Sequence, residues 1–158
     1  MAETVDWQRL ANALRELHGT LVDTTRREYE RAHLVELGSG ELLQLLTSNP
    51  EFEWLHGLSE LMVDLDLVHD SAPGDDDDIT TAVRAAVEHL LSNAQEPAGV
   101  FAQRYWPYVH QDPRVAMAHG AMKQALSAWP PPPQLDTATL LQERHRLAEK
   151  ARHLAKRK

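Results

Sequence analysis

Three histidines fall where a helical pattern places apolar side chains. His18, His69 and His119 each lie on the apolar face of a different predicted helix, among leucine, valine and methionine residues. Asp66 flanks the apolar arc that contains His69. Imidazole nitrogens and carboxylate oxygens are common ligands of divalent transition metals. Convergence of these four side chains would create a site for a metal ion or a small ligand.

A set of core hydrogen bonds explains the same residues more simply. Burying a polar group without a partner costs about 2–7 kcal/mol, so each of these groups should be paired. Arg104 stands among aromatic residues, and Asp66 is its natural partner in a buried ion pair. We favour this interpretation because positions on separate helices do not establish proximity. No cofactor is therefore expected, and a divalent metal is the alternative.

Motifs that specify a reaction are absent from the sequence. There is no glycine-rich phosphate loop, no H-E-x-x-H and no nucleophile elbow. A Glu-x-x-His pair occurs at Glu30 and His33, but Glu30 falls on the polar face of its predicted helix, so the pair does not indicate a di-metal bundle. The chain has no cysteine, which excludes disulfides, thiolate nucleophiles and cysteine-ligated zinc. These absences favour a protein that is not an enzyme.

Residues 52–70 are predicted to form the central helix of the fold. Apolar residues cover most of its circumference, and Val63 and Leu67 are apolar on the side opposite the main arc. A helix of this kind is normally surrounded by other helices or by a second subunit. We therefore expect self-association, as a two-fold dimer that covers Val63 and Leu67.

The remaining pattern predicts an all-α, single-domain bundle of five to seven helices. A chain of 158 residues suits one domain with a sizeable core. Glycines, prolines and capping residues mark the ends of the segments. Besides the central helix, the predicted helices cover residues 5–32, 41–47, 79–93, a stretch that starts near Pro97, 113–129 and a basic C-terminal segment from about Thr137.

Charge divides the domain into two parts, a core of residues 1–133 and a basic helix within residues 134–158. No lysine or arginine lies between Arg31 and Arg84, where twelve acidic residues occur. Residues 136–158 carry a local charge of +4, although the whole chain carries −8. The basic residues of this interaction tail are Arg144, Arg146, Lys150, Arg152, Lys156, Arg157 and Lys158.

The tail is expected to pack on the acidic region, in the same chain or in a partner subunit. Binding to nucleic acid is disfavoured, because the acidic body would repel phosphate groups. The apolar seam of the tail is narrow, so it should be the least stable element. Four prolines, Pro130 to Pro133, form a semi-rigid spacer before it.

The sequence predicts a cytoplasmic protein without membrane insertion. No run approaches the roughly 20 apolar residues that a membrane-spanning helix requires. The first ten residues carry acidic side chains where a signal peptide has basic and then apolar ones. Abundant arginine, alanine and leucine suggest a bacterial genome rich in G and C.

Two classes of function remain open. The favoured one is a non-enzymatic interaction or regulatory protein that acts on a protein partner through its acidic surface and its basic tail. The alternative is a helical bundle, enzymatic or not, that binds a metal or small ligand through His18, Asp66, His69 and His119.

Overall fold

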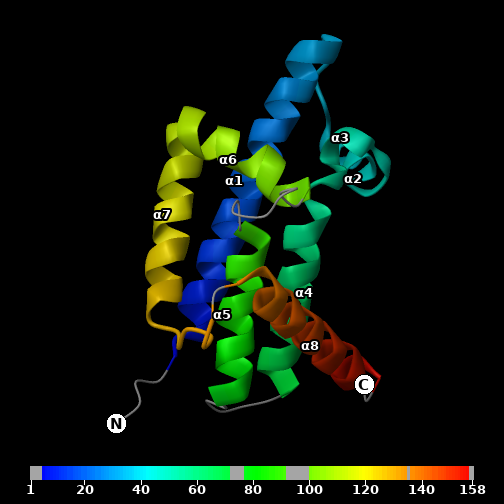
Figure 1. Cartoon of the computed structure of the whole chain (residues 1–158). Helices are drawn as coiled ribbons and strands as arrows, with labels where there is room; N and C mark the ends of the chain where they lie inside the picture. Colours follow the sequence, from blue (N-terminus) through cyan, green and yellow to red (C-terminus); the bar gives the residue numbers. More distant parts are fainter. Residues whose placement is uncertain (1–4, 72–76, 92–99, 135, 157–158) are drawn as a thin grey trace.

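The computed structural model describes residues 5–71, 77–91, 100–134 and 136–156, and every secondary-structure element in these ranges is a helix (Figure 1). The predicted all-α class is therefore confirmed, with one helix more than the expected five to seven. The eight helices are α1 (Trp7–His33), α2 (Ser39–Ser48), α3 (Pro50–Glu53), α4 (His56–Ser71), α5 (Asp77–Leu91), α6 (Val100–Gln111), α7 (Pro113–Ser127) and α8 (Thr137–Ala155).

The predicted central helix is divided into α3 and α4. Asn49 caps α3, because its side-chain oxygen accepts a hydrogen bond from the Glu51 N–H at 2.8 Å, and Pro50 occupies the first turn. The chain turns at Trp54 and Leu55, both buried, before α4 begins. The apolar arc of α4 lies in the core as predicted, with Leu58, Leu61 and Val68 fully buried.

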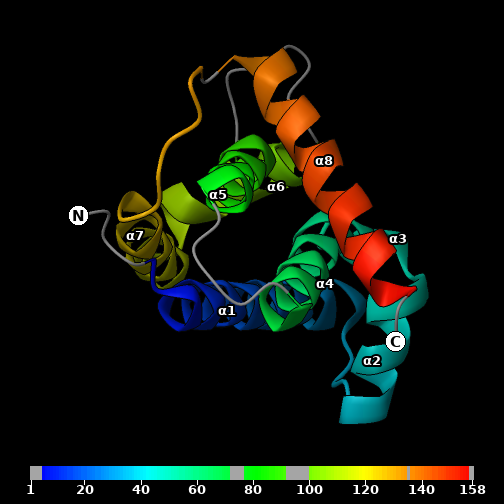
Figure 2. The same ribbon diagram turned by 90° about the horizontal axis from the view of Figure 1, so that it is seen from below.

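The helices pack around α5, which lies at the centre when the bundle is viewed along its length (Figure 2). Small residues of α5, including Ala85 and Ala86, are completely buried and allow neighbouring helices to approach closely. The most extensive contacts join α5 to α8 and α1 to α7. The first helix also packs along α4.

The long helix α1 reaches beyond the bundle at its C-terminal end (Figure 1). Asp6 caps its start by accepting a hydrogen bond from the Arg9 N–H at 2.9 Å. Leucines along the first half are buried, whereas every residue from Arg31 to Glu36 is exposed. Leu34 ends the helix in the left-handed conformation, with φ of 55°.

The helix α8 packs on the core of its own chain, running obliquely across α5 and α4 (Figure 2). Its buried residues are those of the predicted seam, namely Leu140, Leu147, Ala151 and Leu154. The proline spacer is partly integrated into the fold, because Pro132 is buried. None of the described helices is long and apolar enough to cross a membrane.

Candidate functional site

Two of the predicted core histidines, His18 and His69, lie in separate surroundings. The His18 Nε2 is 3.0 Å from the Ser59 hydroxyl, and burial lowers the pKa of His18. His69 is exposed, and its ring stacks on Trp7 with 4.9 Å between the ring centroids. Trp7 precedes His18 by eleven residues on α1, which corresponds to about 16 Å along a helix. These two histidines therefore do not share a ligand.

His119 belongs to a third environment, between α7 and α6. Its Nδ1 lies 2.7 Å from the Tyr105 hydroxyl. Burial raises the pKa of Tyr105 and lowers that of His119, and the charge of Lys123 lowers the latter further. Both groups are therefore neutral near pH 7, and the tyrosine O–H can donate to the imidazole. The arrangement is a satisfied hydrogen bond at the edge of the core.

The predicted ion pair between Asp66 and Arg104 is wrong. Asp66 is exposed and lies 3.7 Å from Arg15 on α1, since this side of α4 borders α1 and solvent. Arg104 belongs to α6 and is also exposed, with its guanidinium 5.8 Å from the centroid of the Trp54 ring. Neither residue is the buried charge that the sequence pattern implied.

The four predicted ligands do not assemble into a metal centre. Among the residues that the structure describes, no group of three or more histidine, aspartate or glutamate side chains could hold a metal ion. His18, His69 and His119 instead have serine, tryptophan and tyrosine neighbours, respectively. The arrangement of side chains in the described residues therefore does not support the metal-binding alternative.

The interaction tail contributes one largely buried ion pair. The Arg144 Nη1 lies 2.8 Å from the Asp64 Oδ2 on α4, which joins the tail to the acidic region of the same chain. Arg146 pairs with Glu143 at 2.5 Å within α8. Of the other basic residues of the tail, Lys150, Arg152 and Lys156 are exposed. Arg157 and Lys158 lie outside the described residues.

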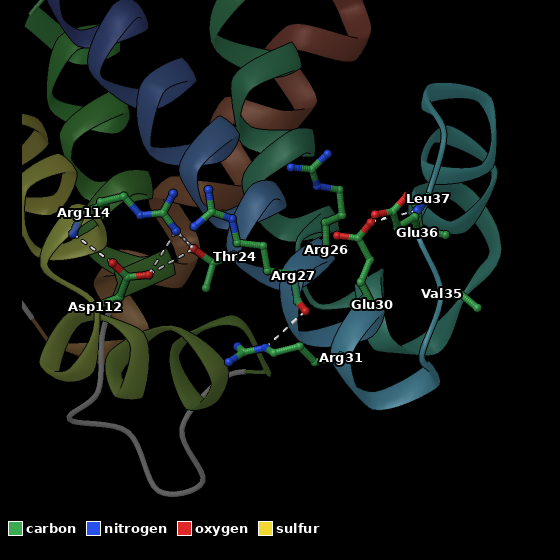
Figure 3. Close-up of a pocket in the computed structure, with 10 residues that line it drawn as sticks. All are labelled: Thr24, Arg26, Arg27, Glu30, Arg31, Val35, Glu36, Leu37, Asp112 and Arg114. Carbon is green, nitrogen blue, oxygen red and sulfur yellow. Dashed lines mark hydrogen bonds and ion pairs between the residues drawn. The ribbon is translucent and has the colours of Figure 1, made fainter.

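An arginine-lined pocket was not predicted from the sequence. It is an open depression of about 810 Å³ between the C-terminal half of α1, the start of α7 and the segment that leads to α2 (Figure 3). Its arginines are Arg26, Arg27 and Arg31 from α1 and Arg114 from α7. Two of them, Arg27 and Arg31, are one helical turn apart. We call this depression the arginine pocket.

Asp23 binds three of these arginines. Its Oδ1 accepts a hydrogen bond from Arg26 at 2.6 Å, and its Oδ2 lies 3.1 Å from the Arg27 Nε and 2.9 Å from the Arg114 Nη1. The hydrogen bond from Arg114 is the main reason that the pKa of Asp23 is lowered. One carboxylate is thus shared by three permanently charged groups. In addition, the Arg26 Nε is buried without a hydrogen-bond partner.

Two further carboxylates of the pocket, those of Asp112 and Glu30, have structural partners. Asp112 caps α7 by accepting a hydrogen bond from the Arg114 N–H at 2.9 Å. Burial alone would raise the pKa of Asp112, but the hydrogen bonds from Arg114 outweigh that effect and lower it. Glu30 accepts a hydrogen bond from the Leu37 N–H at 2.8 Å. Arg31 forms no ion pair with any described residue, and its Nε only approaches the Arg27 carbonyl at 3.4 Å.

Residues 34–53 form a second distinctive surface, which we call the acidic arm. They connect α1 to α4 and lie beside the bundle (Figures 1 and 2). Leu34 is 91% exposed and Leu43 is 64% exposed, and no residue of α2 is buried. The exposed acidic residues of the arm are Glu36, Glu41, Glu51 and Glu53.

The described residues contain three surfaces of interest, which are the arginine pocket, the acidic arm and the exposed part of the tail. None of the three presents a nucleophile with an adjacent base, so geometry does not assign a reaction to them. Comparison with known proteins does not assign a function either, since no protein-family model, no curated protein and no solved structure matches the chain.

Proposed function

We propose that the chain is a non-enzymatic interaction or regulatory domain whose acidic arm binds a basic amphipathic helix of a partner protein. One observation carries the proposal, namely that α2 contains four leucines of which none is buried. A helix of ten residues is marginally stable in water and normally depends on packing of its apolar face. The apolar surface of α2 is only partly covered by its own chain.

The leucines of α2 divide into two groups. Leu42, Leu45 and Leu46 are half-buried against the core, whereas Leu43 points outward. Leu34 and Val35 at the end of α1 add exposed apolar surface to the same arm. Contiguous apolar surface with a polar rim is typical of protein-binding sites. Burial of one leucine side chain would contribute about 1.5–3 kcal/mol to such a complex.

The charge of the arm supports a basic partner. The arm carries four exposed acidic side chains, and no lysine or arginine occurs between Arg31 and Arg84 to neutralise them. Complementary charge accelerates association and disfavours partners of the wrong sign. An amphipathic helix with lysines or arginines beside its apolar face would satisfy both the leucines and the carboxylates of the arm.

The tail has a different role in this proposal. Its pair between Arg144 and Asp64 connects α8 to the acidic region of the same chain, so this contact stabilises the domain itself. The exposed Lys150, Arg152 and Lys156 remain available for a second contact with an acidic partner. The body of the protein retains a negative charge, which continues to disfavour nucleic acid.

Self-association is the second part of the proposal. Val63 on α4 is 57% exposed, and it borders a shallow pocket of about 290 Å³ that His56, Ser59 and Glu60 also line. Leu67, one turn further, is half-buried. A two-fold dimer through α4 would cover Val63 and complete the burial of Leu67.

Binding of a defined helical peptide tests the proposal. The probe is a synthetic amphipathic peptide of leucine and lysine, compared with a peptide in which every lysine is replaced by glutamate. Fluorescence anisotropy should show that only the lysine peptide binds, and that added salt weakens the complex. Leu43→Asp should weaken binding at least about tenfold, because it removes a leucine contact worth about 1.5–3 kcal/mol.

Met117→Asp is the matched control. Met117 on α7 is 76% exposed and lies outside the arm, so the control makes the same kind of change at a comparable apolar site. It should leave the affinity for the lysine peptide unchanged. Equal effects of the two substitutions, or equal binding of the two peptides, would show that the arm is not the binding surface.

A further inference from the structure

We propose that the arginine pocket binds a phosphate-bearing small molecule, with the phosphate group held by Arg27, Arg31 and Arg114. The pocket shares Val35, Glu36 and Leu37 with the acidic arm but includes none of the leucines of α2, and the inference does not rest on the function proposed for the arm. The inference rests on the position of the three guanidinium groups, on their unused hydrogen-bond donors and on the size of the pocket.

Two of the three guanidinium groups, those of Arg27 and Arg114, are held close to one another by the fold. Arg27 and Arg114 both contact the Oδ2 of Asp23, so their side chains are adjacent although they come from different helices. In Figure 3 the guanidinium groups of these two residues point toward one another, and Arg31 lies one turn further along α1. An anion at the mouth of the pocket would meet positive charge from both α1 and α7.

Several donors in this group have no partner. Arg27 uses its Nε for Asp23, and neither of its Nη groups forms a hydrogen bond with a described residue. The two Nη groups of Arg31 are equally free of partners within the described ranges. Guanidinium groups stay charged at every physiological pH and present their N–H groups in a planar fork that matches the oxygens of phosphate. Unused forks on neighbouring residues are therefore suited to one shared oxyanion.

The number of arginines that line the pocket favours phosphate over carboxylate. A terminal phosphate has three oxygens that carry charge and can accept hydrogen bonds from three guanidinium groups at once. A carboxylate has only two oxygens for the same purpose. Four of the chain's arginines line this one pocket, together with the carboxylates of Glu30, Glu36 and Asp112.

The dimensions of the pocket indicate what the phosphate is attached to. Its volume of about 810 Å³ lies in the range of small-molecule sites and exceeds the volume of a phosphate ion. Glu30, Val35 and Glu36 line the side near α2, away from Asp112 and Arg114 (Figure 3). Carboxylates there would repel a second anionic group and accept hydrogen bonds from hydroxyl or amino groups. The expected ligand therefore has one phosphorylated end and one polar, uncharged or cationic end.

Calorimetric titration of the full chain at constant ionic strength tests the site. The probes are inorganic phosphate, glycerol 3-phosphate and the dicarboxylate succinate. Both phosphate compounds should bind, glycerol 3-phosphate should bind more tightly than inorganic phosphate, and succinate should bind at least about tenfold more weakly than either. Arg31→Gln should weaken binding of glycerol 3-phosphate by about tenfold or more, the usual effect of losing hydrogen bonds to a charged group.

Arg9→Gln is the matched control, because Arg9 lies on the same helix, is exposed and is outside the pocket. It should change the affinity by less than about twofold, as expected for a remote surface charge. Arg31 makes only one long contact, so Arg31→Gln should fold like the wild type, which circular dichroism verifies. In the unaltered protein, the NMR signal of the Arg31 Nε–H should shift during titration with glycerol 3-phosphate.

Four results would overturn the assignment. They are the absence of binding by either phosphate compound, equal affinity for succinate, equal weakening by the two substitutions, and an Arg31 Nε–H signal that does not move while glycerol 3-phosphate binds. Tighter binding of inorganic phosphate than of glycerol 3-phosphate would overturn the requirement for an attached polar group.

Discussion

The ion pair between Asp64 and Arg144 should stabilise the protein more than the pair between Asp66 and Arg15. Both aspartates lie on α4, two residues apart, but their surroundings differ. The first pair is 2.8 Å apart with side chains 18% and 17% exposed, and the second is 3.7 Å apart with side chains 57% and 53% exposed. The gross attraction is about 6 kcal/mol for the first pair at an effective dielectric constant of about 20, and about 1 kcal/mol for the second at the value of water, about 80.

Desolvation reduces the contribution of the first pair but does not abolish it. Removing two charges from water offsets most of their attraction, which leaves a coupling energy of about 1–3 kcal/mol. The exposed pair should couple by no more than about 0.5 kcal/mol, because solvent and salt screen it and both side chains lose conformational freedom. The structure therefore predicts that the coupling energies of these two ion pairs differ several-fold, although both aspartates lie on α4.

Two double-mutant cycles measure this difference. The first combines Asp64→Asn with Arg144→Gln, and the second combines Asp66→Asn with Arg15→Gln. Urea unfolding followed by circular dichroism gives the free energies of unfolding, since guanidinium chloride would screen both pairs. Equal coupling energies in the two cycles, or a value below about 0.5 kcal/mol for Asp64 and Arg144, would refute the reasoning from burial.

Three further predictions concern other parts of the fold. Leu147→Ala should lower the free energy of unfolding by about 2–5 kcal/mol in urea, because Leu147 is buried where α8 meets the core, whereas Leu141→Ala on the exposed side of α8 should have little effect. Burial lowers the pKa values of His18, His89 and His119 below 6.5, so the unfolded chain takes up protons first as the pH falls. The free energy of unfolding should therefore fall between about pH 7 and about pH 5, and His18→Gln should reduce that slope; an unchanged slope in this variant would contradict the role of His18. Val63→Glu should convert the expected dimer to a monomer in sedimentation at concentrations where the wild type associates, and a monomeric wild type would remove the dimer from the proposed function.

Local patterns in the sequence were sufficient to predict most of the helices. The periodicity of the first helix and the start of a helix at Pro113 are confirmed, because both depend on residues close together in the chain. The break at Trp54 and Leu55 was missed, since neither residue disfavours a helix by itself. Buried packing of both side chains accompanies that turn, and packing is not visible in a local pattern.

The surroundings of polar groups were harder to predict than the helices. His69 lies at the spacing of core residues yet is exposed, because α4 meets Trp7 there at the margin of the bundle. The arginine pocket was missed because Arg27 falls on the polar face of the first helix. Periodicity places a residue on a face of its own helix, but it does not reveal that Arg114 lies opposite.

The order of contacts in the bundle has a consequence for how the chain folds. The helix α1 packs mainly on α7, from which it is separated by five other helices in the chain, and α5 packs mainly on α8. During synthesis, the leucine face of α1 would remain uncovered until α7 leaves the ribosome. The valines of α5 would likewise remain uncovered until α8 does. Closure of such long loops slows folding relative to bundles whose neighbouring helices pair in sequence, and it leaves apolar surface exposed on the nascent chain. The protein should consequently fold slowly for an all-helical domain and depend on chaperones more than its size suggests.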